Sequence, residues 1–181
     1  MPDRLYDAHV HLVELRSELS GINSAYDEIG LGKAVVVSTS PEDWADVMNL
    51  CSTDNRFIPA VGLHPWRVNE APDAWQEQLL GCLVQGARVI GELGLDQWIE
   101  GFDIDRQQEA FRWQLSLAAE RNLPTSIHCL KAHEPLLQTL RAVELPDRGF
   151  KLHAYNGLVD TMKPLLVLGA SLLQGETSVS R

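Results

Sequence analysis

The sequence predicts an α/β protein whose fold is a (β/α)8 barrel of the TIM type, shortened to about six or seven βα units. Short runs of β-forming residues alternate with longer segments in which apolar residues recur at helical spacing, a pattern typical of parallel strands joined by crossover helices. Polar side chains that can bind metal close several of the apolar runs. In a barrel the carboxyl ends of all strands share one mouth, so these side chains are expected to meet there.

Six runs rich in β-forming residues are predicted as strands, and each is bounded by residues that favour turns or helix starts. A seventh run, residues 170–173, is a further candidate. The six predicted strands span residues 5–11, 34–39, 57–62, 88–93, 125–129 and 150–154.

The segments between the strands carry helix signals. Ser40-Pro41-Glu42 combines a capping residue with a proline in the first turn, and this predicts the start of a helix that runs to about Cys51. Residues 105–121 place apolar side chains at helical spacing and polar ones on the opposite face. Pro124 ends that segment, because proline disfavours helix in the residue before it.

Length and composition predict one globular domain, residues 1–181, because typical domains have about 100–200 residues. The chain is 45% hydrophobic and 22% charged, close to the globular average. Its apolar runs are far shorter than the roughly 18 residues that a membrane helix needs, and the N-terminus lacks an apolar signal core. We therefore expect a cytoplasmic protein with no membrane partner.

Net charge and cysteine content exclude some classes of protein and of binding site. Fifteen basic and 25 acidic residues give a net charge of −10, which opposes the long-range attraction that nucleic-acid binders use. The three cysteines are far apart, with no Cys-x-x-Cys pair, so a thiolate zinc site and a disulfide framework are not expected. Buried free thiols are the prediction.

Asp7, His9 and His11 alternate along the first predicted strand, which places their side chains on one face. A buried strand face normally carries aliphatic residues, so two histidines there suggest a shared metal, although satisfied core histidines are the alternative. Glu92, between glycines near the end of the fourth strand, is costly to bury unless it is paired or bound to metal.

His128 and His153 close the fifth and sixth predicted strands. Each alone would more often be structural, but together with the first-strand pair and Glu92 they converge on one barrel mouth. Four imidazoles and one carboxylate suit zinc, manganese or a similar ion, and their number suggests two divalent ions bridged by Glu92. Two such ions about 4 Å apart activate water and stabilise a leaving group, so hydrolysis is the natural reaction class.

These residues resemble the TatD family of metal-dependent deoxyribonucleases. The resemblance runs from residue 5 to about 170 and implies a β/α barrel hydrolase with exonuclease or phosphodiesterase activity on DNA. It also implies that His9 and His11 bind one metal, that His128 and His153 bind the other, and that Glu92, the predicted catalytic residue, bridges them. The motifs that carry it are Asp7-Ala-His-Val-His-Leu12, Gly62-Leu-His-Pro65, Gly91-Glu-Leu-Gly-Leu-Asp96, Ile127-His-Cys129 and Leu152-His-Ala-Tyr-Asn-Gly157.

The resemblance gives further residues a role. His64 would face the substrate phosphate, or only cap a turn, and Lys131 would lie near the phosphate, or be a solvated charge. Asp7 would orient a metal-binding imidazole from behind, because such rings usually donate their second nitrogen to an acceptor. Asp96 would do the same or cap the following helix. Trp66 would form a pocket wall or be a covered surface residue.

The chain departs from the family at its C-terminal end. The family has an aspartate in a Glu-Thr-Asp-x-Pro motif after the last strand, whereas Glu176-Thr177-Ser178 has serine there, at the wrong spacing. A typical barrel takes about 250 residues, so this chain is expected to end near the seventh strand. An open barrel edge predicts aggregation or completion by a partner, including self-association.

The predicted function is a metal-dependent hydrolase of the TatD type, in which two divalent ions (Mg, Mn or Zn) activate water to cleave DNA ends or a small phosphodiester. One alternative is an amidohydrolase-type deacetylase or lactonase. Such sites often bridge their metals with a modified lysine, so Glu92 favours the nuclease. The other alternative is a non-catalytic metal-binding remnant or fragment. Turnover with added metal would discriminate between the two classes.

Overall fold

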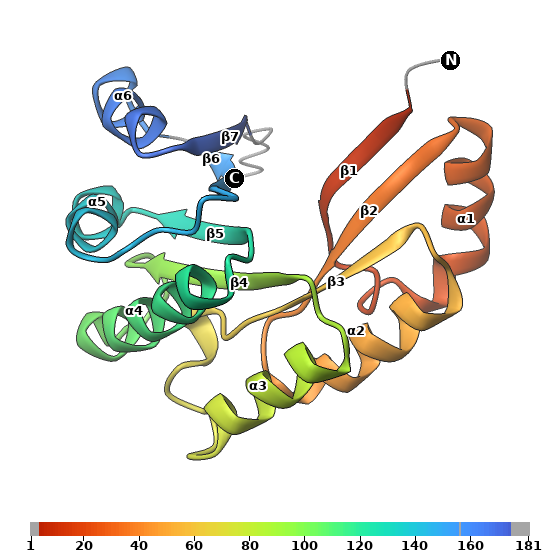
Figure 1. Ribbon diagram of the computed structural model, residues 1–181, viewed down its shortest axis with the longest axis horizontal. Coiled ribbons are helices and arrows are strands. Elements are labelled where there is room, and N and C mark those ends of the chain that lie inside the picture. Colours follow the sequence, from red (N-terminus) through yellow and green to blue (C-terminus); the bar gives the residue numbers. More distant parts are fainter. Residues whose placement is uncertain (1–3, 156, 175–181) are drawn as a thin grey trace.

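The structure is a computed structural model that describes residues 4–155 and 157–174. Seven strands form one parallel sheet in which neighbours in sequence are neighbours in space, from β1 to β7. The sheet curls, and the helices cover its outer side (Figure 1). The predicted α/β fold of six or seven βα units, wound as the wall of a barrel, is confirmed.

The strand boundaries differ from the predicted ones mainly at β2 and β4. Strand β2 begins three residues early, directly after Gly30, whose φ of +66° turns the chain out of the preceding helix. Strand β4 runs on to Asp96, because residues 93–96 stay paired with β5 beyond a register shift. The strands are β1 Leu5–Val10, β2 Leu31–Val37, β3 Phe57–Val61, β4 Val89–Asp96, β5 Thr125–Leu130, β6 Phe150–Tyr155 and β7 Ala170–Gln174.

The two helices predicted from the sequence, α2 and α4, lie within about two residues of their expected bounds. In α2 Pro41 is the first residue, and the Asp43 carboxylate accepts hydrogen bonds from two backbone N–H groups before it. In α4 Asp103 caps the first turn by accepting from the N–H of Arg106 at 3.1 Å. None of the helices in the described ranges is long and apolar enough to cross a membrane. The helices are α1 Leu19–Glu28, α2 Pro41–Thr53, α3 Trp75–Gln85, α4 Ile104–Arg121, α5 His133–Ala142 and α6 Val159–Val167, with short 3-10 turns η1 Arg16–Glu18 and η2 Pro65–Arg67.

The main core lies between the sheet and its outer helices. Phe111 and Leu115 of α4 are fully buried against Leu93 and Ile127 of the central strands. Each such side chain stabilises the fold by roughly 1.5–3 kcal/mol. All eight residues of β4 are buried, including the carboxylates of Glu92 and Asp96. Buried acids need partners, so the centre of the sheet is where polar chemistry has to be concentrated.

The three cysteines are free thiols. Burial raises the pKa of the Cys51 and Cys129 thiols to about 12 and also raises that of Cys82. The reactive thiolate is therefore scarce at neutral pH.

Candidate metal centre

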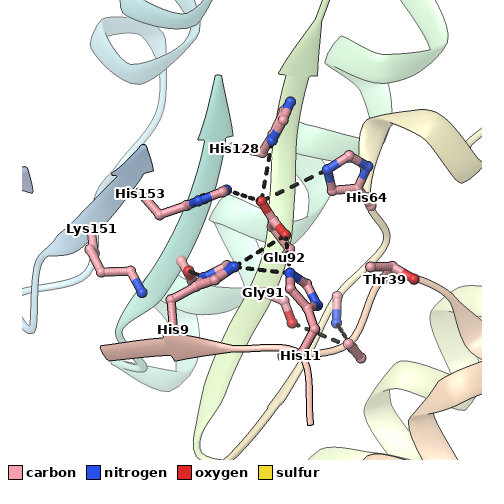
Figure 2. Close-up of polar contacts among 12 residues, drawn as sticks. His9, His11, Thr39, His64, Gly91, Glu92, His128, Lys151 and His153 are labelled. Atoms are coloured by element: carbon pink, nitrogen blue, oxygen red, sulfur yellow. Dashed lines mark hydrogen bonds and ion pairs between the residues drawn. The ribbon is translucent and has the colours of Figure 1, made fainter. Parts of the chain in front are cut away.

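The five predicted ligands meet at the carboxyl ends of the strands (Figure 2). His9 comes from β1 and His11 from the residue after it, while Glu92 lies in β4, His128 in β5 and His153 in β6. Glu92 is at the centre of the group and only 2% exposed. Strands far apart in the sequence thus bring four imidazoles around one carboxylate.

The two oxygens of Glu92 face different pairs of histidines. Oε2 lies 3.6 Å from Nε2 of His9 and 3.5 Å from Nε2 of His11. Oε1 lies 3.3 Å from Nδ1 of His128 and contacts Nε2 of His153. Figure 2 shows these contacts as dashed lines that radiate from the carboxylate. A carboxylate placed between two pairs of nitrogens has the arrangement that bridging two metal ions requires.

The protonation states of Glu92 and His9 suit metal binding at neutral pH. Burial raises the pKa of Glu92, but hydrogen bonds with His11, His128 and His153 outweigh it and hold that pKa well below its usual value. Burial lowers the pKa of His9 to about 3, although the charge of Glu92 opposes the shift. The carboxylate is therefore ionised and the His9 ring neutral, with a lone pair available.

On the β1 side, the Ser126 hydroxyl orients His9 from behind, 3.0 Å from Nδ1 of the ring. Nε2 of His9 then faces Nε2 of His11 at 3.1 Å. Two nitrogen lone pairs this close repel each other unless a proton or a cation lies between them. The donor set on this side fits a metal ion.

On the β5 side, Asp96 fixes His128. Its Oδ2 lies 2.7 Å from Nε2 of the ring, which leaves Nδ1 to face Glu92. Burial lowers the pKa of His128, but hydrogen bonds with Asp96 and Glu92 outweigh this and raise that pKa to about 9. Burial raises the pKa of Asp96, but the bond to His128 and three other donors bring it to about 2. A carboxylate behind an imidazole is the usual support of a metal-binding histidine.

His64 joins the group with its proton in a defined place. Its Nδ1 accepts a hydrogen bond from the backbone N–H of Trp66 at 3.1 Å, and its Nε2 lies 3.8 Å from Oε1 of Glu92. Burial lowers the pKa of His64 to about 3, so the ring is neutral. Because Nδ1 uses its lone pair to accept, the proton is on Nε2. His64 therefore presents a hydrogen-bond donor to the cleft.

Two sets of three residues are compact enough to hold an ion, because the ligand atoms within each set all lie within 4.8 Å of one another. They are His9, Glu92 and His153, and His64, Glu92 and His128. This grouping differs from the predicted pairing of His9 with His11 and of His128 with His153. The carboxylate oxygens give another division, in which Oε2 faces His9 and His11 while Oε1 faces His128, His153 and, at 3.8 Å, His64. The Nε2 proton of His64 argues against its use as a ligand.

The ligands open into a cleft of about 290 Å³ at the barrel mouth. Trp66, for which the sequence left two readings, is part of its wall, and Arg67 beside it adds a positive charge. The lining residues are His11, Glu14, Thr39, His64, Trp66, Arg67, Glu92, His128 and His153.

Two of the predicted supporting residues lie in other positions than expected. Asp7 accepts from the backbone N–H of His9 and from the Tyr26 hydroxyl, so within the described residues it holds the strand and not an imidazole. The expectation that it orients a ring was wrong because its carboxylate is satisfied locally. Lys131 extends over the ring of Trp98, 3.8 Å from its centroid, and does not line the cleft. Residues 176–178 lie outside the described part of the chain.

Two supporting residues were missed from the sequence. Ser126 supports His9, and Lys151 donates from Nζ to the carbonyl of Ala8 in β1 (Figure 2 shows it pointing toward His9). Burial lowers the pKa of Lys151 to about 8, although the charge of Glu92 opposes this. Ser126 and Lys151 each lie two residues before a predicted ligand of the same strand, and this spacing was the available signal.

Comparison with known proteins places the chain in a family. The sequence profile described as "TatD related DNase" matches residues 6–174. The chain is 31% identical over 153 residues to an "Uncharacterized metal-dependent hydrolase YjjV" of Escherichia coli, with 83% of this chain and 59% of that protein covered. It is 38% identical over 176 residues to a "3'-5' ssDNA/RNA exonuclease TatD" of Yersinia pseudotuberculosis, with 93% of this chain and 66% of that protein covered.

Solved structures agree with this placement. The crystal structure of YjjV from Escherichia coli superposes with a TM-score of 0.87 at 28% identity, covering 95% of this chain and 68% of that one. A TatD family hydrolase from Entamoeba histolytica, at 20% identity, shares the fold with a TM-score of 0.81 and the same 95% coverage of this chain. The chain spans 59% of the length of the Escherichia coli hydrolase that it matches. By the profile match, the identities and the shared fold, this chain belongs to the TatD family.

Proposed function

We propose that this chain is a metal-dependent phosphodiester hydrolase that removes nucleotides from the ends of single-stranded DNA or RNA. The observation that carries the proposal is the division of the Glu92 oxygens between two pairs of histidines. The Yersinia pseudotuberculosis relative, named an exonuclease on ssDNA and RNA, supports the substrate class.

The residues present fit two divalent ions. His9 and His11 would hold one, His128 and His153 the other, and Glu92 both. Mg, Mn and Zn are the candidates, and a set rich in imidazole favours Zn or Mn over Mg. Two bound ions supply an activated water and charge stabilisation for an in-line displacement at phosphorus.

The chain's own groups then position the substrate. The Nε2–H of His64 points toward the centre of the cleft and can donate to a non-bridging phosphate oxygen. Arg67 lies at the same wall and is half exposed, so it can meet a phosphate without the cost of burial. Lys131, at the rim beside Trp98, stays a predicted contact for a more distant phosphate.

The overall charge limits the form of the substrate. A net charge of −10 repels the long phosphate backbone of a duplex, whereas an end that enters the cleft brings only one or two phosphates close to the metals. Short single strands and small phosphodiesters are therefore favoured.

The test combines metal content with digestion of a labelled single-stranded oligonucleotide. We expect about two divalent ions per folded chain and a loss of digestion of more than roughly 100-fold in Glu92→Gln, because a lost ligand costs more than a lost supporting residue. Glu109→Gln is the matched control, since Glu109 is an exposed carboxylate on α4.

The outcomes separate the alternatives. Bound metal without hydrolysis of any phosphodiester would favour a non-catalytic metal-binding protein. Hydrolysis of acetylated amines or lactones instead of oligonucleotides would favour the deacetylase or lactonase. A folded chain that binds no divalent metal contradicts the proposal.

Two further expectations stay predictions. Strands β1 and β7 are the two edge strands of the described sheet, so self-association through them is expected. Light scattering after size exclusion, over a range of concentrations, tests it. The cytoplasmic location is tested by cell fractionation.

A further inference from the structure

Trp66 is a large aromatic side chain held rigidly beside the candidate metal centre. Its indole N–H donates to Oδ2 of Asp96 at 2.8 Å, and its backbone N–H donates to His64 at 3.1 Å. Its ring lies edge to face with the ring of His64, with centroids 5.0 Å apart at 80°. The side chain is anchored at both ends.

In spite of these anchors, Trp66 is 49% exposed and lines the cleft. An indole with its N–H already satisfied gains little from water on its exposed surface and gains from contact with another flat apolar ring. The fixed ring loses little side-chain entropy when it is covered, which makes it suited to stacking.

The position of Trp66 in the cleft indicates which ring of a bound substrate could stack on it. His64 and His128 are the neighbours of Trp66 in the cleft, at ring centroid distances of 5.0 Å and 6.2 Å. A nucleotide whose phosphate lies at the His64 donor has its base within reach of the indole. Arg67, next in the chain, adds a positive charge on the same wall.

We propose that Trp66 is a stacking platform for the unpaired base of the nucleotide at the scissile phosphate. The proposal rests on the proposed function and adds a reason for strand selectivity. Bases in a duplex are paired and stacked on each other, so a duplex must fray before its end can occupy the platform. The ligand class is thus a single-stranded nucleic acid end.

The test compares hydrolysis of two single-stranded oligonucleotides by the metal-loaded protein, one ending in an intact nucleotide and one ending in an abasic nucleotide. Wild type should favour the intact end by roughly 5- to 150-fold in kcat/KM, the range that stacking on one aromatic side chain provides. Trp66→Ala should lose this preference. Trp66→Phe should keep most of it, because phenylalanine retains the ring and loses only the bond to Asp96.

Trp98→Ala is the matched control. Trp98 is 62% exposed near the same mouth, but it does not line the cleft and uses only its backbone N–H to contact Asp96. It should leave the preference for the intact end unchanged. A preference that survives in Trp66→Ala would overturn the proposal. So would an equal loss in Trp66→Phe and Trp66→Ala, since the ring would then act only through Asp96.

A binding measurement separates this proposal from the proposed function. Fluorescence anisotropy of the same labelled oligonucleotides in EDTA needs no hydrolysis. If wild type cleaves neither substrate but binds the intact end more tightly than the abasic one, and Trp66→Ala does not, the proposed function fails and the platform stands. Equal binding of both ends by wild type overturns the platform.

Discussion

Asp96→Asn is the substitution that most directly tests how the site is held. Oδ2 of Asp96 accepts from His128 and from the indole of Trp66, at 2.7 and 2.8 Å. Oδ1 accepts from the backbone N–H groups of Trp98 and Ile99, at 2.7 and 3.1 Å. Asparagine has nearly the same shape but only one oxygen, so one pair of donors must face an NH2 group.

The backbone donors cannot change, so the asparagine oxygen is expected to face them and its NH2 group to face His128. Nε2 of His128 must then accept, and the proton moves to Nδ1, the atom that faces Glu92 and that would bind metal. Loss of a supporting partner of this kind typically lowers metal affinity by roughly 10- to 100-fold. We expect that loss, together with a less stable metal-free fold.

The stability change has a defined pH dependence. The pKa of Asp96 is lowered from 3.8 to about 2, so its contribution is present above about pH 4 and is lost as the pH falls through 2. The pKa of His128 is raised from 6.5 to about 9, so its contribution is full below pH 6.5 and is lost as the pH rises through 9. In the metal-free protein the pair therefore contributes about 2–3 kcal/mol between pH 4 and 6.5.

The assay is chelator competition for metal affinity, with urea unfolding in EDTA at pH 5.5 and 9.5 for stability. The difference in unfolding free energy between wild type and Asp96→Asn should be about 2–3 kcal/mol at the lower pH and smaller at the higher. Asp103→Asn is the matched control, because asparagine also caps helices well and Asp103 contacts only the first turn of α4. Wild-type metal affinity in Asp96→Asn would refute the argued role of the His128 tautomer.

Two other changes test the sheet itself. Gly94→Ala should destabilise the fold by about 3 kcal/mol or more in urea unfolding, because a Cβ there would lie 2.0 Å from a carbonyl oxygen of β5 and the residue has a φ of +146°. The control is Gly81→Ala, which lies in open space on α3 and should stabilise the fold slightly. A tolerated Gly94→Ala would show that β4 and β5 are farther apart than described. Lys151→Met should lower the free energy of unfolding by about 1–2 kcal/mol, because it leaves the carbonyl of Ala8 without its donor. Lys33→Met removes a comparable bond to a carbonyl at the exposed surface and should leave the free energy of unfolding almost unchanged. Equal losses in the two lysine variants would contradict a specific role for the buried one.

The strand order and the convergence of the candidate ligands followed from local pattern. Alternating residues on a strand share a face, and the carboxyl ends of parallel strands share an edge, so the convergence of His9 and His11 with Glu92 could be predicted before any coordinates. The helix start at Pro41 followed from capping chemistry, which acts over three or four residues, and the helix over 104–121 followed from the spacing of its apolar residues.

The supporting contacts could not be predicted in this way, because each depends on how two distant strands or loops meet. Ser126 supports His9 from 117 residues away, and Asp96 was recognisable as a candidate but not as the partner of His128 in particular. Asp7 shows the converse, since its position suggested a partner for an imidazole while its carboxylate was satisfied by nearby groups.

The sequence by itself determined the order of the βα units, the residue types of the candidate metal centre and the strands that carry them, because periodicity and end effects act over a few residues. Only the tertiary structure decided which oxygen of Glu92 meets which pair of histidines, where the proton of His64 lies and that Trp66 is fixed at the cleft. Those properties depend on distances of about 3 Å between strands, and such distances are set by the packing of the whole sheet.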